Sequence, residues 1–226
     1  MEVSALALHG RFRSRATTSN VRDPHGGFIM GKLPRVAAVA VALALTACGD
    51  DNPTSQGPAP VIDQAFEPGT PTSVVTVGSV GAYAQTFTAG ITGTLTSVDL
   101  LLSTQGGDDT IRVDVRGTSG GNPNLDDAVV LGSRLIAATS LPAYPSTAFV
   151  AVNLASQAIL VDSGQVLAIV LIRVAGTGPP DVVMRSESSL AEEYPNGTAM
   201  QRNGGSGTAW MSLTYDNFFR TRVLVP

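Results

Sequence analysis

The sequence predicts an all-β fold, an antiparallel jelly-roll-like β-sandwich of about nine or ten strands, preceded by a disordered leader and tether. Apolar residues in the second half of the chain recur with a period of two rather than 3.6. Clusters rich in Gly, Pro, Asn and Asp separate these segments and supply turns. Many short strands joined by such turns are typical of two stacked sheets.

Four segments carry the strand pattern most clearly. In residues 110–118, three aliphatic residues alternate with Arg112, Asp114 and Arg116, which predicts one buried and one solvated face. Residues 165–174 are apolar almost throughout, as expected for a central strand that is covered on both faces. Residues 147–156 and 217–226 alternate again.

Near the N-terminus, residues 36–47 are apolar or small and lead directly to Cys48, the only cysteine. The run is too short for a membrane span, which needs roughly 20 apolar residues. Because Lys32 and Arg35 precede it and small residues end it, it has the order of a secretory signal. The alternative is a core strand that contains one buried free cysteine.

Residues 45–48, Leu-Thr-Ala-Cys, resemble the lipobox of bacterial lipoproteins. The resemblance implies that the Cys48 thiol receives a diacylglycerol group, that the chain is cut before Cys48, and that the new amine is acylated. Several acyl chains make a stable membrane anchor. We therefore expect a lipid-anchored protein of the bacterial cell envelope. In lipoproteins of enteric bacteria, an Asp directly after the lipidated Cys retains the protein in the inner membrane. Here Gly49 stands between Cys48 and Asp50, so we expect the outer membrane.

These features divide the chain into four parts. Residues 1–29 are expected to be an unstructured upstream extension, since Met30 would make a normal start. Residues 30–47 are the predicted lipoprotein signal peptide, and residues 48–60, rich in Asp, Pro and Gly, a flexible tether. Residues 61–226 form the predicted β-sandwich domain, which is long enough for a substantial core.

The composition of the predicted mature chain excludes several functions. From Cys48 onward there are eight arginines, sixteen acidic residues, no lysine and no histidine, for a charge of about −8. Such a chain repels phosphate backbones, so nucleic-acid binding is not expected. Without histidine, lysine or a free thiol, it cannot form a Ser-His-Asp triad, a His-ligated zinc site, a Schiff base or a cysteine nucleophile. Carboxylate chemistry, oxygen-ligated calcium or magnesium and surface recognition remain.

Residues 84–103 contain a Gln-x-Phe pair followed by Gly-x-Leu-x-x-Val-x-Leu-x-Leu. This pattern resembles the opening of secreted bacterial sandwich modules that carry the choice-of-anchor label. Further matches are residues 119–123 and 168–171, Trp210, Asp216, Phe219 and Arg220. The resemblance covers about residues 64–225 and implies an exported sandwich module more than any particular activity.

Four residues are candidates for ligand binding: Tyr194, Asn196, Trp210 and Tyr215. Exposed aromatic rings can stack on sugar rings while amides bond sugar hydroxyls, so these residues predict contact with a glycan. In the alternative interpretation, Trp210 fills the core and the tyrosines cap its edge.

Acidic residues suggest two further sites. Asp108, Asp109, Asp126 and Asp127 are calcium candidates, although Asp and Asn beside Gly also serve turns and no EF-hand spacing is present. We therefore expect no cofactor, with calcium as the alternative. Asp181, Glu187, Glu192 and Glu193 are dense enough to suggest glycoside hydrolysis, or else a solvated loop.

The sequence as a whole predicts a lipid-anchored envelope module with a non-enzymatic binding, adhesion or structural role. Its expected partners are the membrane, through the lipid on Cys48, and a glycan or another envelope protein. The alternative function is a carboxylate-dependent polysaccharide hydrolase.

Overall fold

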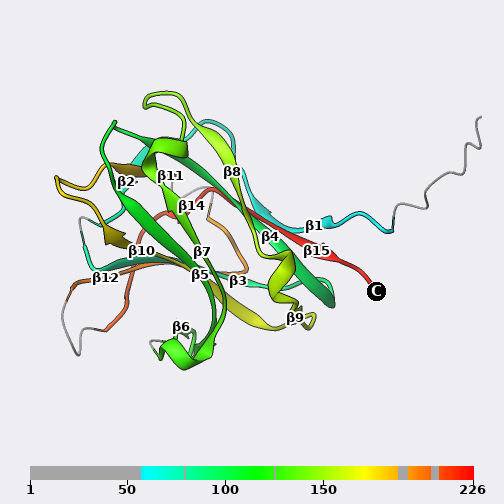
Figure 1. Cartoon of the computed structure of the whole chain (residues 1–226). Coiled ribbons are helices and arrows are strands. Elements are labelled where there is room, and N and C mark those ends of the chain that lie inside the picture. The colour runs from blue at the N-terminus through cyan, green and yellow to red at the C-terminus, as the bar shows by residue number, and fades with distance from the viewer. Residues whose placement is uncertain (1–56, 79, 125, 188–192, 205–208) are drawn as a thin grey trace, which may run out of the picture. The chain divides into compact units, whose positions relative to one another are not determined.

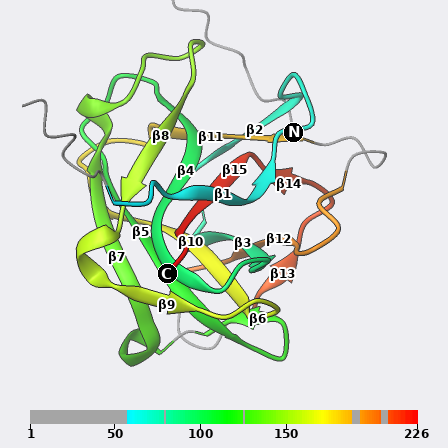
Figure 2. The same cartoon turned by 90° about the vertical axis from the view of Figure 1, so that its right-hand side faces the viewer.

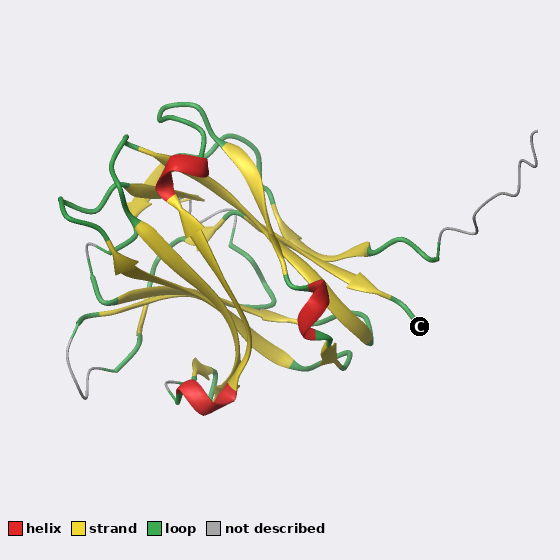
Figure 3. Cartoon of the chain, viewed as in Figure 1, coloured by secondary structure: helices red, strands yellow, loops and turns green. Residues whose placement is uncertain are grey.

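The computed structural model describes residues 57–78, 80–124, 126–187, 193–204 and 209–226. Within them the predicted all-β fold is confirmed, as two antiparallel sheets pack face to face in a β-sandwich (Figure 1). Three short 3-10 helices, Asp127–Val129, Ala138–Ser140 and Ala155–Gln157, lie between strands (Figure 3). No helix in the described part of the chain is long and apolar enough to cross a membrane.

The first sheet has eight strands. Its main path runs in the order β1 (Val61–Phe66), β15 (Phe219–Leu224), β4 (Gly93–Thr104), β11 (Val182–Glu187) and β14 (Asp216–Asn217). β2 (Ser73–Thr76) pairs with β11, while β8 (Ala148–Asn153) and β9 (Ile159–Val161) pair with β4. The first and last strands are therefore neighbours, with Val61 opposite Val223 (Figure 2).

The second sheet has seven strands and holds the candidate site. Its order is β13 (Met211–Ser212), β12 (Ala199–Arg202), β3 (Ala82–Thr88), β10 (Val166–Ala175), β5 (Thr110–Ser119) and β6 (Asn122–Pro123). β7 (Val130–Ala137) pairs with β5. β10 is central, and residues 167–171 in its first half are buried, as its apolar sequence predicts.

The described residues form fifteen strands, more than the nine or ten expected. Nine of them have six residues or more: β1, β3, β4, β5, β7, β8, β10, β11 and β15. The other six have two to four residues, too few to show a readable apolar period. Of the nine longer strands, β5, β8, β10 and β15 correspond to the four segments with the clearest predicted strand pattern, whereas the short strands have no predicted counterpart.

The core lies between the sheets and is built from the inward side chains of both. Ile111, Val113 and Val115 of β5 are fully buried, as their alternation predicts. Aromatic rings close one part of this core, where Tyr194 meets Phe219 edge to face with ring centroids 5.1 Å apart.

The predicted solvation of the opposite face of β5 is wrong. Asp114 is 0% exposed and Arg116 is 3% exposed. On the neighbouring β10, Val170 stands beside Asp114 and Ala168 beside Arg116, and both belong to a small apolar cluster on the outer face of the second sheet. Its members are Ala82, Ala84, Ala168, Val170 and Met200, with Ile172 and Trp210 packed against them.

Candidate functional site

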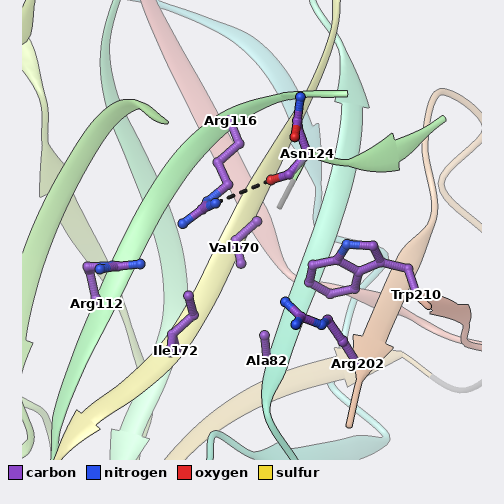
Figure 4. Close-up of a pocket in the computed structure, with 8 residues that line it drawn as sticks. All are labelled: Ala82, Arg112, Arg116, Asn124, Val170, Ile172, Arg202 and Trp210. Carbon is purple, nitrogen blue, oxygen red and sulfur yellow. Dashed lines mark hydrogen bonds between the residues drawn. The ribbon is translucent and has the colours of Figure 1, made fainter. Parts of the chain in front are cut away.

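A hollow lies on the outer face of the seven-stranded sheet and is called the arginine–tryptophan pocket below (Figure 4). It has a volume of about 190 Å³. Sites for drug-sized ligands typically span roughly 300–1,000 Å³, so this pocket suits one small ring. The residues that line it are Ala82, Arg112, Arg116, Asn124, Val170, Ile172, Arg202 and Trp210.

The pocket is hollow because short side chains lie between long ones. Its floor comes from the central strands β3 and β10, which turn Ala82, Val170 and Ile172 outward. Arg112 on β5 stands opposite Ile172, and Arg202 on β12 stands opposite Ala82. In Figure 4 the β5 arginines and the Arg202–Trp210 pair therefore face each other across this floor.

A buried carboxylate holds the wall on β5 in place. Arg116 Nη2 donates to Asp114 Oδ2 at 2.6 Å, and Arg116 Nε donates to the same oxygen at 3.1 Å. Arg112 Nε lies 3.1 Å from Asp114 Oδ1, which also accepts from Ser133 Oγ at 2.7 Å. A buried charge is tolerated when it is paired and hydrogen-bonded in this way.

One turn connects the two walls of the pocket. Arg116 Nη1 donates to the backbone carbonyl of Asn124 at 3.2 Å (Figure 4). The indole Nε1 of Trp210 donates to the backbone carbonyl of the preceding residue, Pro123, at 2.9 Å. The segment after β5 therefore fixes one arginine and the tryptophan together.

Two glycines give this segment its course. Gly120 and Gly121 have φ values of 60° and 83°, which side-chain-bearing residues rarely adopt. They allow β5 to reverse into β6, where Ser119 pairs with Asn122. The Gly-Gly pair in the sequence thus sets the position of the two carbonyl groups that hold the pocket.

A second hollow of about 200 Å³ adjoins the first. The two share Ala82, Ile172 and Arg202, and the second adds Asn203 together with two glycines. A Cβ on Gly81 would lie only 2.7 Å from the backbone nitrogen of Gly204, so glycine is needed at this close approach.

Of the four predicted ligand-binding residues, only Trp210 lines the arginine–tryptophan pocket. Tyr194 is 5% exposed and lies in the main core, where its hydroxyl donates to Gln64 Oε1 at 2.7 Å. Burial, followed by the nearby charges of Asp63 and Asp216, raises the pKa of Tyr194 and keeps the phenol neutral. This placement corrects the expectation that Tyr194 offers its ring to a sugar.

The other two predicted residues do not join Trp210 either. Tyr215 is half-buried against the main core, and burial raises its pKa. Asn196 is exposed, and its backbone carbonyl accepts from Thr88 Oγ1 at 3.1 Å. The four residues therefore do not form one aromatic platform.

The calcium candidates for which contacts are described bond to the protein itself. Asp109 is buried, pairs with Arg173 and accepts from the backbone N–H of Asp181 at 2.9 Å. Asp108 accepts two hydrogen bonds from Thr177, which lower its pKa. Asp126 accepts from the backbone N–H of Ala128, whereas the side chain of Asp127 lies outside the described part.

Within the described ranges, no group of three or more His, Cys, Asp or Glu side chains is placed to hold a metal. The acids considered for hydrolysis differ in their surroundings. Glu187 is buried and accepts from Thr72 Oγ1 at 2.7 Å, Glu193 is exposed, and Glu192 lies outside the described residues. Asp181 is buried beside Asp109, and burial raises its pKa.

Sequence reasoning missed the three arginines of the pocket. The available signal was the spacing of Arg112 and Arg116, which places both on one face of a strand. Arg202 stood beside a glycine-rich turn and gave no sign that it lies across the sheet from them. That relationship depends on the strand order, in which β3 and β10 separate β12 from β5.

The fold and the pocket together define a β-sandwich with a cationic hollow, flanked by tryptophan, on the outer face of one sheet. No protein-family model matches the chain, and comparison with curated protein sequences gives no significant match. The resemblances to bacterial lipoproteins and to choice-of-anchor modules therefore stay predictions. Cys48, on which the first depends, lies outside the described residues.

Proposed function

We propose that this protein is a non-enzymatic binding module of the bacterial cell envelope, attached to the membrane through a lipid on Cys48. Its ligand is a glycan, which binds in the arginine–tryptophan pocket. The observation that carries this proposal is the combination of one indole, an aliphatic floor and several guanidinium groups in a single hollow.

A sugar ring has the complementary chemistry. Its C–H faces pack against aromatic and aliphatic side chains, and its hydroxyls accept hydrogen bonds from guanidinium groups. The bond from Trp210 Nε1 to the Pro123 carbonyl fixes the indole beside the floor formed by Ala82 and Val170. A ring held in this way loses little conformational freedom when a ligand binds, which favours affinity.

Binding without hydrolysis is the better-supported function for this pocket. Glycoside hydrolysis by the usual route needs two carboxyl groups on either side of the scissile bond. The described residues that line the pocket include three arginines and no Asp or Glu. Asp114 is held beneath the arginines, where its oxygens accept hydrogen bonds from protein groups.

A glycan array probed with the purified full-length protein tests this proposal. The wild type should bind a defined set of glycans, and Trp210→Ala should lose that binding while keeping its melting temperature within a few degrees. Tyr144→Ala is the matched control, because Tyr144 is an exposed aromatic residue outside the pocket. Absence of glycan binding by the wild type, or equal binding by Trp210→Ala, would contradict the proposal.

A further inference from the structure

The arginine–tryptophan pocket concentrates positive charge on an acidic protein. From Cys48 onward the chain has eight arginines against sixteen acidic residues. Three of those arginines, Arg112, Arg116 and Arg202, line this one pocket. Asp114 bonds to the two on β5, and the described residues that line the pocket include no Asp or Glu. The local charge is therefore opposite to that of the chain as a whole.

Two of these positive groups are also held in position before a ligand arrives. Arg116 is 3% exposed and is fixed by Asp114 on one side and by the Asn124 carbonyl on the other. The side chain of Arg112 is 31% exposed and is tethered to the same carboxylate. A guanidinium fixed in this way loses little freedom on binding, and its planar donor set matches the oxygens of an acidic group.

We infer that the pocket selects acidic sugars, with the sugar ring on the aliphatic floor beside Trp210 and its carboxylate or sulfate among the guanidinium groups. This inference rests on the proposed glycan-binding function and specifies its ligand class. The pocket volume fits one such ring, and the adjoining hollow that shares Arg202 accepts a neighbouring ring. A short acidic oligosaccharide therefore fits better than a long polyanion, which the overall negative charge repels.

Titration calorimetry with the full-length protein tests the inference. The probes are digalacturonate, the neutral disaccharide galactobiose, and galactobiose that carries a sulfate. The acidic disaccharides should bind about tenfold tighter than the neutral one, as expected when one charge-assisted hydrogen bond is added. That advantage should shrink as sodium chloride rises from about 0.05 to 0.5 M, because salt screens the charges.

Arg202→Gln should lower the affinity for the acidic disaccharides more than the affinity for the neutral one, so that the preference for acidic probes shrinks. Arg134→Gln is the matched control, because it removes the same charge from an exposed arginine outside the pocket. Arg202→Lys keeps the charge but loses the planar donor set, so it should give an intermediate affinity. It also serves as the test variant if Arg202→Gln fails to fold.

The outcomes separate the inference from the proposed function. Equal affinity for neutral and acidic disaccharides would overturn the inference and leave glycan binding intact. No binding of any disaccharide, together with an empty glycan array, would overturn both. Preferential binding of digalacturonate supports a carboxylate ligand, and preferential binding of the sulfated disaccharide supports a sulfate ligand.

Discussion

Arg116 and Asp114 form a buried ion pair on the outer face of a sheet, with Arg116 Nη2 2.6 Å from Asp114 Oδ2. A strand with this alternation normally exposes such residues to water. Here the pair is covered, so each charge depends on the other and on the hydrogen bonds from Ser133 and to Asn124. The pair therefore links the stability of the sandwich to the shape of its pocket.

Replacement of Asp114 should cost much of the stability of the domain. Asp114→Asn leaves the Arg116 charge buried without a counter-charge, and such a loss typically costs about 3–5 kcal/mol. Urea unfolding at pH 7 measures the change in the free energy of unfolding. Glu67→Gln is the control, because Glu67 and Arg220 form a partly exposed pair, which is worth about 1 kcal/mol or less. Equal stability of the two variants would contradict this account.

Tyr194 should matter for stability and not for ligand binding. Tyr194→Phe removes the hydroxyl that donates to Gln64 and should destabilise the protein by about 1 kcal/mol. Tyr194→Ala also empties a large core site and should cost about 3–5 kcal/mol. Thermal melts and the glycan array measure the two properties on the same samples. Loss of binding by Tyr194→Phe at unchanged stability would contradict this assignment.

Asp181 should make the protein less stable as the pH rises. Burial raises its pKa in the folded state above the ordinary value of 3.8, and the neighbouring Asp109 adds to this effect. The native state then binds more protons than the unfolded state, so stability falls as the pH rises from 3.8 through the raised pKa. Asp181→Asn should remove this loss and raise the melting temperature at pH 7 by a few degrees.

Asp108 provides a comparison of opposite sign for that experiment. Its pKa is lowered by hydrogen bonds from Thr177, so it contributes stability above the ordinary carboxyl pKa that is lost as the pH falls through its lowered value. Melting temperatures of the wild type and of Asp181→Asn, measured between about pH 3 and pH 8, show which group controls the change in stability. A wild-type and an Asp181→Asn curve of the same shape would contradict the role given to Asp181.

Calcium should not change the stability of the domain. The oxygens of Asp108, Asp109 and Asp126 already accept hydrogen bonds from nearby groups of the chain. Melting curves recorded with calcium and with a chelator should therefore coincide. A higher midpoint in calcium would instead favour a bound ion, since a ligand that binds only the folded state raises the melting temperature.

Cys48 should carry the lipid. Growth with radioactive palmitate should label the wild type, and the label should appear in the outer-membrane fraction. Cys48→Ser should remove the label and release the protein from the membrane, because the anchor depends on acyl chains attached at that residue. Label that persists in Cys48→Ser would contradict both the attachment site and the predicted localisation.

The sequence predicts the sandwich well because burial leaves a strong periodic signal in long strands. β5 and β10 show this, the first by strict alternation and the second by an unbroken apolar run. The same rule fails for Asp114 and Arg116, since alternation says which residues share a face and not what covers that face. Here Ser133 on the neighbouring β7 contacts Asp114, and the Asn124 carbonyl contacts Arg116.

The site is harder to predict because it joins residues that are distant in sequence. Arg202 lies across the sheet from Arg112 because the strands are arranged in the order β12, β3, β10 and β5. No local sequence pattern encodes that order. A small residue such as Ala82 looks like an ordinary strand residue in the sequence, although it contributes to the floor of the pocket. Trp210 can be chosen from the sequence because it is the only tryptophan. Its hydrogen bond to the Pro123 carbonyl cannot be predicted in the same way.

The pairing of β1 with β15 brings both ends of the domain to the same layer of the sandwich. The first and last strands of the domain, β1 and β15, both belong to the eight-stranded layer. The arginine–tryptophan pocket opens on the outer face of the seven-stranded layer. In the proposed function, the eight-stranded layer would serve attachment and the seven-stranded layer would serve capture. A reporter fused after Pro226 would emerge from the attachment layer and leave the capture layer open to a ligand.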